Sequence, residues 1–460
     1  MSRANILLIM TDQQRGDCLS CAGHPVLLTP NMDSIAGAGT RFSHAYSSCP
    51  VCIPARRSLM SGQFPATHGL AGYRDGLEWN PAATLPGALK AAGYHTALTG
   101  RKMHLHPLRK RYGFDHMVVQ SGIEPADYEA WLAQHAPPSA GGVRGAGITH
   151  NDRTARPWHL DEALHFTNWT ASQAEHFLRT TRDPSCPYFL VVSFAAPHPP
   201  LVPPAFYFDR YLRQDLPPPV IGDWATPPPN NGIGLPVESP RVNLTGETLR
   251  SCRAGYYGLI NHVDDQILRL LNPVEGLVDD NTIILFTADH GEMLGDHYLF
   301  RKSLPYEGSA RIPLLIRAPN MPAGQVVEEA VCLEDLMPTV LELAGVAIPA
   351  SVEGRSLVPL LRGERPAWRP YLYGECAPAM HYLTDGVEKY IWFVADGREQ
   401  LFNLREDPTE CHDLAGGAAK RVTFWRQRLI EELRGRPEGF TDGKRLIPGR
   451  HYAIVIPSRA

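Results

Sequence analysis

Short apolar runs and longer amphipathic stretches alternate along most of the chain. Runs of four to seven apolar residues without polar alternation are typical of strands buried on both faces of a sheet. These runs occupy residues 5–10, 188–194, 282–287 and 313–316. Residues 85–92 and 255–271 instead carry apolar side chains at helical spacing. The alternation predicts an α/β fold in which a mainly parallel, mixed sheet is flanked by helices.

The pattern changes near residue 366, where hairpin-like segments replace the alternation. Short strand patterns separated by turn residues such as Asp396-Gly397 favour an antiparallel sheet. The strand patterns lie at 371–374, 389–394 and 399–403, and a helical pattern closes the chain at 423–434. We therefore expect a large α/β domain over residues 1–365 and a smaller C-terminal α+β domain over residues 366–460.

Two Pro- and Gly-rich stretches interrupt the large domain. They cover residues 137–142 and 216–232. Loops of this kind carry function more often than regular elements do, and ligands of parallel sheets gather at the carboxyl ends of the strands. We expect both stretches to form rims of a substrate cleft, with domain linkers as the alternative.

Composition narrows the class of protein. The chain has 460 residues, 43% hydrophobic and 20% charged, with a formal net charge of −4 and no long Lys/Arg cluster. Nucleic acid and anionic membranes are therefore not expected partners. No apolar stretch approaches the roughly 18 to 20 residues of a membrane span. The apolar run at 5–10 lacks a cleavage site and continues into polar residues, which favours a first strand over a signal peptide.

Nine cysteines are scattered from Cys18 to Cys411. An odd number without regular spacing does not indicate a disulfide framework and suits a reducing compartment. We expect a cytoplasmic protein, and the sequence leaves homo-oligomerisation open.

Cys52 occupies the most informative position. It comes two residues before Pro54, which suits the first turn of a helix, and Gly62 can end that helix. Cys52 would then lie where unpaired backbone N–H groups and the positive end of the helix dipole stabilise an anion. Two other readings stand beside a catalytic thiol: a zinc or dithiol site with Cys18, Cys21 and Cys49, and an inert core thiol.

The residues around Cys52 carry a resemblance to a known family. They are Thr29-Pro30-Asn31-Met32-Asp33, Gly39, Phe42, Ala45-Tyr46, Cys49-Pro50, Cys52-Ile53-Pro54-Ala55-Arg56, Leu59 and Gly62. This run closely resembles the type I sulfatases of the alkaline phosphatase superfamily, and the resemblance spans nearly the whole chain. It implies that Cys52 is oxidised to formylglycine by a maturation enzyme, and that the aldehyde hydrate supplies the attacking oxygen.

Acidic residues and a histidine follow two of the predicted strands. Asp12 comes directly after the first strand, and Asp289-His290 follows the strand that ends at Thr287. Both groups should therefore emerge at one edge of the sheet. The resemblance implies one divalent cation there. The expected ligands are Asp12, Asp289, His290 and the modified Cys52, with Gln13 as a weak or indirect ligand.

The acidic pattern departs from the commonest sulfatase arrangement. Many members have two adjacent acids after the first strand and an Asp-Asn pair later, whereas this chain has Asp12-Gln13 and Asp289-His290. That arrangement resembles choline sulfatases and phosphonate monoester hydrolases. We expect calcium in a carboxylate site, while the imidazole leaves manganese or magnesium open. The choice between sulfur and phosphorus esters also stays open.

Further basic residues fit an anion clamp. The resemblance assigns catalytic contacts to Arg56, Lys102, His104, His198 and Lys302, with Tyr73 and Arg74 as weaker substrate contacts. Arg101 is an insertion relative to the family's second signature at residues 93–104, so either Arg101 or Lys102 could be the matching cation. For most histidines, including His262 and His297, a structural role is the better interpretation.

The implied function is the hydrolysis of a sulfate ester with release of inorganic sulfate. The cation would activate one hydroxyl of the hydrate, His198 would protonate the departing alcohol, and His104 would help expel sulfate through the second hydroxyl. One rival function is a phosphonate monoester or phosphodiester hydrolase that uses the same residues. The other is a non-catalytic metal- or thiol-dependent binding protein. The substrate's alcohol, whether small molecule or saccharide, is not fixed by the sequence, and no dense aromatic cage indicates a quaternary ammonium.

Overall fold

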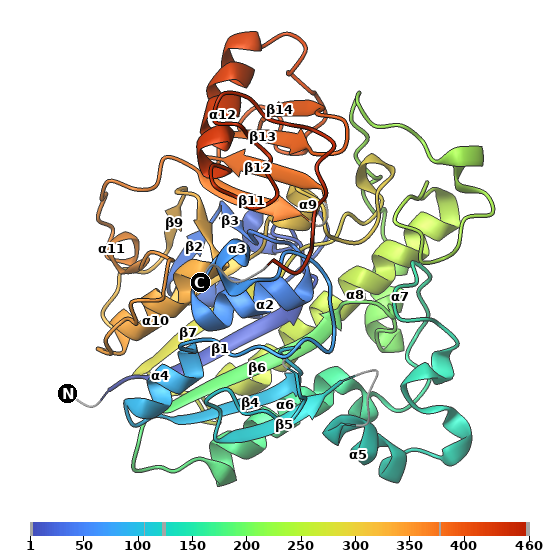
Figure 1. Ribbon diagram of the computed structural model, residues 1–460. Coiled ribbons are helices and arrows are strands. Elements are labelled where there is room, and N and C mark those ends of the chain that lie inside the picture. The colour runs from blue at the N-terminus through green and yellow to red at the C-terminus, as the bar shows by residue number, and fades with distance from the viewer. Residues whose placement is uncertain (1–2, 105, 122–125, 377–378, 457–460) are drawn as a thin grey trace.

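The computed structural model describes residues 3–104, 106–121, 126–376 and 379–456, and is built around one large mixed sheet (Figure 1). The sheet has eight strands in the order β5-β4-β6-β1-β7-β8-β2-β9. Their bounds are β1 Asn5–Asp12, β2 Thr40–Phe42, β4 His95–Arg101, β5 His116–Gln120, β6 Tyr188–Pro197, β7 Thr282–Ala288, β8 Leu314–Arg317 and β9 Gln325–Val327. A separate two-stranded pair joins β3 Ala45–Tyr46 to β10 Val331–Cys332.

The centre of the sheet is parallel. Strand β1 lies between β6 and β7, with Leu8 opposite Val191 on one side and Leu285 on the other. Strand β8 runs antiparallel to β7 because the chain between them stays at the edge where β7 ends and re-enters the sheet from there. The predicted α/β class and mainly parallel sheet are confirmed.

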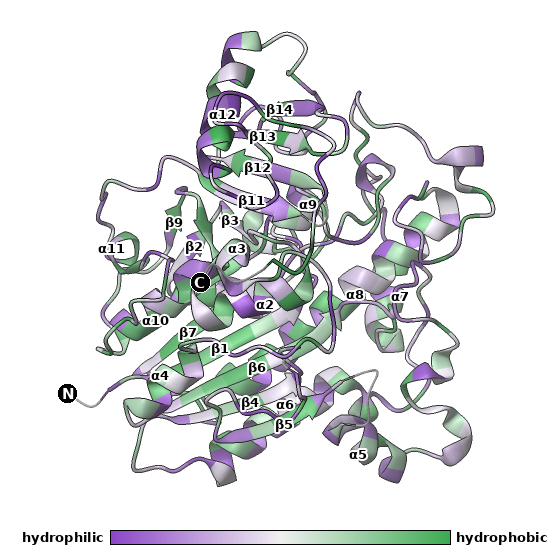
Figure 2. Cartoon of the chain, in the orientation of Figure 1, coloured by the Kyte–Doolittle hydropathy of each residue, from purple (hydrophilic) through white to green (hydrophobic). Residues whose placement is uncertain are grey.

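Helices cover both faces of the sheet. Alternate residues of β1 enter two cores, since Leu7 and Ile9 pack with one set of helices and Ile6 and Leu8 with the other. The first set is α1 Pro30–Gly37, α5 Asp127–His135, α6 Phe166–His176, α7 Ala205–Leu212 and α8 Gly246–Leu271. The second set is α2 Cys52–Ser61, α4 Leu85–Ala91, α10 Leu336–Leu343 and α11 Val358–Leu361. Figure 2 shows the central strands as the most hydrophobic part of the chain.

The C-terminal part forms a four-stranded antiparallel sheet in the order β11-β12-β13-β14, closed by one helix. The bounds are β11 Leu372–Cys376, β12 Met380–Thr384, β13 Glu388–Phe393, β14 Glu399–Asn403 and α12 Ala419–Glu432. One face packs Tyr390 and Leu401 against Trp425 of α12. The expected boundary near residue 366 falls between α11 and β11, and the structure adds β12, a strand that the pattern did not predict.

The other face of this small sheet packs on the β3–β10 pair and on the chain that follows β7. Ile391 and Phe402 share a cluster with Tyr46 and Tyr306 of the preceding chain. Hydrogen bonds reach further: the Tyr382 hydroxyl donates to the carbonyl of Ser47 at 2.8 Å. The backbone N–H of Glu375 donates to the carbonyl of Ser48, also at 2.8 Å. The small sheet therefore holds the segment that leads into α2.

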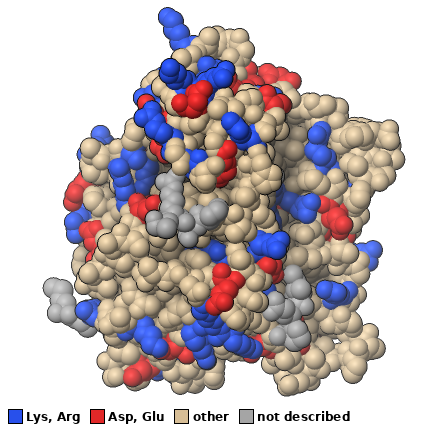
Figure 3. All heavy atoms as spheres, viewed as in Figure 1, with Lys and Arg blue, Asp and Glu red and all other residues tan. Residues whose placement is uncertain are grey.

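The surface matches the modest net charge. On the face shown in Figure 3, Lys and Arg side chains are interspersed with Asp and Glu. Within the described ranges, no helix combines the length and apolar character that a membrane crossing requires. All nine cysteines are free thiols.

Candidate active site

Four strands of the large sheet deliver polar residues to one edge. Strand β1 ends at Asp12, β4 ends at Arg101, and β7 is followed by Asp289 and His290. Strand β6 ends at Pro197, directly before His198. Because these strands are parallel, their carboxyl ends meet, which is where α/β sheets bind ligands.

Cys52 and three of the predicted ligands form one compact cluster. The ligand atoms of Asp12, Cys52, Asp289 and His290 all lie within 4.8 Å of one another, and all four residues are buried. Cys52 Sγ is 3.0 Å from His290 Nε2 and 3.6 Å from Asp12 Oδ1. His290 Nδ1 lies 3.0 Å from the carbonyl of Gly291, which leaves Nε2 turned toward the other three groups.

The donor set fits a divalent cation. The cluster offers two carboxylates and one imidazole nitrogen, whose ring is fixed by the bond from Nδ1 to the Gly291 carbonyl. Ligands of these types hold Ca²⁺, Mn²⁺ or Mg²⁺ in proteins. Buried carboxylates require positive charge nearby, and a cation among these four groups would add to the arginine side chains that already contact them. The zinc reading with Cys18, Cys21 and Cys49 is not supported, because none of these thiols belongs to the cluster found among the described residues.

The guanidinium of Arg56 bonds to the carboxylates of both Asp12 and Asp289. Its Nε donates to Asp289 Oδ2 at 2.8 Å, and its terminal nitrogens donate to Asp12 Oδ2 at 3.2 Å and to Ser193 Oγ at 3.1 Å. The side chain is completely buried. Arg56 lies one helical turn after Cys52 on α2, so the helix that presents the cysteine also fixes the ligands.

Helix α2 places Cys52 as its sequence predicts. Val51 is the extended N-cap residue, Cys52 is the first helical residue, and Gly62 ends the helix with a φ of 66° that favours glycine. Burial and the nearby Asp12 raise the pKa of the Cys52 thiol to about 12.

Gln13 lies beside the cluster but its side chain is engaged elsewhere. Its Oε1 accepts a hydrogen bond from Lys302 Nζ at 2.5 Å, and its Nε2 donates to Glu292 Oε2. Its backbone N–H donates to Asp289 Oδ1 at 3.0 Å. Gln13 therefore links Lys302 to the cluster and does not point its amide oxygen at the ligand atoms.

A cavity of about 370 Å³ opens over Cys52, and we call it the reaction cavity. It brings together several of the predicted residues. The polar side chains in its lining are Cys52, Tyr73, Arg101, His104, His150, Asn151, His198, Arg301, Lys302 and Ser303. Arg74 is exposed and does not belong to the lining.

The predicted histidines face this cavity. His198 Nδ1 lies 2.6 Å from the carbonyl of Pro199, which fixes the ring. His104 is 5% exposed and neither of its ring nitrogens has a hydrogen-bond partner among the residues that the structure describes. Its ring lies edge-on to Tyr73, with 6.4 Å between centroids. Buried nitrogens without partners are rare, so His104 is poised for a ligand.

The structure distinguishes between Arg101 and Lys102. Arg101 lines the reaction cavity, and its Nε lies 3.2 Å from Asp12 Oδ2. Lys102 is also buried, but its Nζ approaches Asp75 at 3.9 Å and it is absent from the cavity lining. Gly100, the residue before Arg101 in β4, has a φ of 95° that favours glycine.

Sequence reasoning did not identify His150, Asn151 or Arg301. The ring of His150 stacks near His198, with 4.6 Å between centroids. It lies in the irregular segment after Gly147, where no periodicity marks a site. The stretch at 137–142 precedes this segment directly. The stretch at 216–232 instead bonds to the C-terminal part, for example from the Asp223 N–H to the Cys411 carbonyl at 2.8 Å.

Positive charge dominates the electrostatics of the reaction cavity. Burial alone would raise the pKa of Asp12, but His198, Arg101, Arg56 and Lys302 outweigh burial and hold it well below its usual value. Burial and Lys302 lower the pKa of His198 well below its usual range. Burial and Arg101 do the same to His104. The cavity is suited to an anionic ligand.

This combination of sheet, strand-end ligands and helix-borne nucleophile position defines the alkaline phosphatase superfamily. The chain belongs to the sulfatase family within it: the family described as "Sulfatase" matches residues 4–346. The C-terminal region of N-sulphoglucosamine sulphohydrolase matches residues 295–435.

Named relatives agree with this assignment. The chain is 40% identical to an arylsulfatase of Clostridium perfringens, over 97% of this chain and 98% of the relative. It is 32% identical to a choline-sulfatase of Rhizobium meliloti, over 98% and 91%. The crystal structure of a phosphonate monoester hydrolase of Agrobacterium radiobacter has a TM-score of 0.79 and 27% identity, over 93% of this chain and 95% of the other. The chain is therefore an enzyme of the sulfatase class.

Proposed function

We propose that this enzyme hydrolyses a sulfate ester with a divalent cation and a formylglycine derived from Cys52, and releases inorganic sulfate. The convergence of Cys52, Asp12, Asp289 and His290 within 4.8 Å supports the proposal. The 40% identical arylsulfatase supports the choice of sulfur and of an aryl-type alcohol.

Asp12, Asp289 and His290 would hold the cation together with residue 52. When bound, the cation supplies a Lewis acid that lowers the pKa of the attacking hydroxyl. We favour calcium because two carboxylates dominate the donor set, and keep manganese and magnesium as alternatives because of the imidazole. Gln13, which bonds to Lys302 at 2.5 Å, would orient that lysine and not serve as a ligand.

The formylglycine hydrate supplies two hydroxyl groups on one carbon, one to attack and one through which sulfate can be expelled. Formation of this group would make the maturation enzyme an obligatory partner. Arg56 would keep both carboxylates directed at the cation, since it contacts each of them at 3.2 Å or less.

Residues of the cavity wall would bind the ester and move the protons. Lys302 and Arg101 would neutralise the sulfate oxygens. We assign Arg101 the anion contact that the sequence offered to Lys102, because Arg101 lines the cavity. The bound ester anion would raise the pKa of His198, so that the imidazolium forms and protonates the departing alcohol through Nε2 while Nδ1 stays bonded to the Pro199 carbonyl. His104 would accept the proton of the second hydroxyl, and Tyr73 would contact the substrate.

A phosphonate monoester or phosphodiester hydrolase is the second candidate. The observation in its favour is the structural match to a phosphonate monoester hydrolase, the chain being 27% identical to it over most of its length. Both kinds of ester offer a tetrahedral anion with one departing oxygen, so the same cavity residues would serve.

The test combines the modification with activity. Protein from a host with the maturation enzyme should carry an aldehyde at residue 52, seen by mass spectrometry of its peptide, and should cleave 4-nitrophenyl sulfate faster than 4-nitrophenyl phenylphosphonate. Chelation should abolish turnover, and added Ca²⁺ or Mn²⁺ should restore it. A Cys52→Ser protein should lose steady-state turnover. Unchanged activity of that variant, or a thiol at residue 52 in active protein, would refute the formylglycine route.

A further inference from the structure

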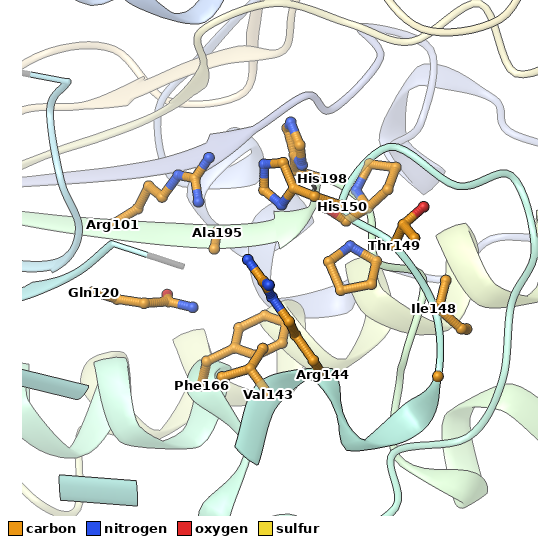
Figure 4. A pocket seen from close by; sticks show the side chains of 13 residues that line it. Arg101, Gln120, Val143, Arg144, Ile148, Thr149, His150, Phe166, Ala195 and His198 are labelled. Atoms are coloured by element: carbon orange, nitrogen blue, oxygen red, sulfur yellow. Dashed lines mark hydrogen bonds between the residues drawn. The ribbon is translucent and has the colours of Figure 1, made fainter. Parts of the chain in front are cut away.

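A second cavity adjoins the reaction cavity and has a different character. We call this cavity of about 440 Å³ the side pocket (Figure 4). Arg101, His150 and His198 line both cavities, so a ligand bound over Cys52 can extend directly into the side pocket. Its volume lies in the range of about 300 to 1,000 Å³ that is usual for small-molecule sites.

The walls of the side pocket are mostly apolar. The apolar residues of its lining are Phe166 from α6, Ala195 from β6, the Pro199-Pro200 pair, Val143 and Ile148. Walls of this composition favour a flat hydrophobic group over a heavily hydroxylated one, because buried hydroxyls would find few partners.

Among the described residues, two polar groups in the pocket have no protein partner. Gln120 is 3% exposed and its Oε1 accepts no hydrogen bond from this part of the chain. Arg144 is exposed and forms no ion pair or hydrogen bond with any described side chain, and in Figure 4 its guanidinium extends into the cavity toward Gln120 and His150. Among the described residues, no Asp or Glu lines this pocket.

The charge of the pocket is therefore positive. Burial lowers the pKa of His150 to about 4, with help from Arg101 and Lys302, so His150 is neutral near pH 7. The guanidinium groups of Arg101 and Arg144 carry the charge. Arg101 contacts Asp12 and is assigned above to the sulfate group, which leaves Arg144 as the cation available to a second anionic group.

We infer that the side pocket binds the alcohol part of the ester, and that it selects an aryl alcohol that carries a second anionic group, bound by Arg144. This inference rests on the proposed function of the reaction cavity. A cationic alcohol such as a quaternary ammonium is disfavoured, because the pocket offers positive charge and its described lining holds Phe166 as its one Phe, Tyr or Trp side chain.

The test compares three esters that differ in one substituent: phenyl sulfate, 4-carboxyphenyl sulfate and 4-(trimethylammonio)phenyl sulfate. The wild-type enzyme should have a kcat/KM at least tenfold higher for the carboxylate than for the cationic ester. Arg144→Gln should lower kcat/KM for the carboxylate about tenfold or more and change that for phenyl sulfate less than about threefold. Thr149→Glu, which places a negative charge at an exposed position of the same lining, should also lower kcat/KM for the carboxylate ester.

Arg213→Gln serves as the charge-matched control, since its side chain is 80% exposed on the distant helix end of α7 and pairs only weakly with Asp209 at 3.5 Å. It should leave all three rates unchanged. Equal losses on every ester in Arg144→Gln, or no preference for the carboxylate in the wild type, would overturn the inference.

Binding of the free alcohols separates this inference from the proposed function. Phenol, 4-hydroxybenzoate and 4-hydroxyphenyltrimethylammonium can be compared by ligand-observed NMR with protein that carries the unmodified thiol. If no sulfate ester is hydrolysed but 4-hydroxybenzoate still binds in an Arg144-dependent way, the proposed function fails and the side-pocket assignment stands. If esters are hydrolysed and binding shows no dependence on Arg144, the assignment fails alone.

Discussion

Replacement of Arg56 by methionine tests most directly how this arginine stabilises the buried carboxylates of Asp12 and Asp289. Methionine keeps the length of the aliphatic stem and removes the guanidinium that joins Asp12 and Asp289. Arg101 would still contact Asp12 at 3.2 Å. Asp289 would retain the backbone N–H groups of Gln13 and His290, each at 3.0 Å, but no cationic side chain.

The cost should be large because all three partners are completely buried. Removal of one member of a buried ion pair costs about 3 to 5 kcal/mol, since a desolvated charge is left behind. The remaining contacts to Arg101 and to backbone N–H groups place the expected loss near the lower end, about 3 kcal/mol. A cation bound by the same carboxylates would supply the missing positive charge, so part of this loss should be recovered with metal.

The assay is urea unfolding of Arg56→Met and wild type at pH 7.5, each with EDTA and with 1 mM Ca²⁺ or Mn²⁺. The free energy of unfolding should fall by about 3 kcal/mol in EDTA, and metal should stabilise the variant more than the wild type. Arg57→Met is the matched control. Arg57 is also buried, but it donates to the Leu77 carbonyl at 2.8 Å and lies over the ring of Trp79.

Arg57→Met should cost about 2 kcal/mol, and its cost should be the same with and without metal. The reasoning about Arg56 would be refuted if both variants lost equal stability in EDTA and responded equally to metal. An Arg56→Met protein as stable as the wild type in EDTA would refute it as well.

Three further predictions concern proton transfer, backbone shape and pH. His198→Gln should lower kcat about 10² to 10⁴-fold for esters of poorly acidic alcohols but far less for 4-nitrophenyl sulfate, whose leaving group needs no proton; equal losses on both would argue against an acid role. Gly100→Ala, at a φ of 95°, would push a methyl group into the Ser193 carbonyl and should lower the midpoint of thermal unfolding by several degrees, while an unchanged midpoint would contradict this. Burial and Arg436 lower the pKa of His381 from 6.5 to about 3. Between pH 6.5 and about 3, the unfolded state therefore binds one proton more than the folded state at this residue. As the pH is lowered through this range, the free energy of unfolding should fall by about 1.4 kcal/mol per pH unit because of His381. His381→Phe should reduce that slope in urea titrations at several pH values, and a slope equal to that of the wild type would disprove the prediction.

Much of the fold follows from local pattern because the central strands are buried on both faces. Strands β1, β6 and β7 are continuous apolar runs, and no other element explains such runs at that length. Strand β12 was not predicted, since its residues Met380–Thr384 mix polar and apolar side chains in a short stretch. Helix α8 begins at Gly246, well before the apolar spacing expected from Gly255, because its first turns are polar.

The candidate site likewise contains residues that the sequence could place and residues that it could not. Residues at strand ends or a helix start, such as Asp12, Cys52 and His290, have positions that the elements themselves dictate. His150 comes from an irregular segment whose path depends on tertiary contacts, so no sequence period could reveal it. Arg101 lines the reaction cavity and Lys102 does not, a difference in side-chain direction that a reading of residue types cannot supply.

The small C-terminal sheet holds the carbonyls of Ser47 and Ser48 by hydrogen bonds, only a few positions upstream of Cys52. A protein truncated before the small C-terminal sheet would lose these hydrogen bonds and expose an apolar face around Tyr46 and Tyr306. Attempts to isolate a minimal catalytic fragment should therefore keep the whole tail. Glu375 and Tyr382 lie outside the lining of the reaction cavity yet hold the segment that leads to Cys52, so libraries aimed at improved turnover have reason to sample them.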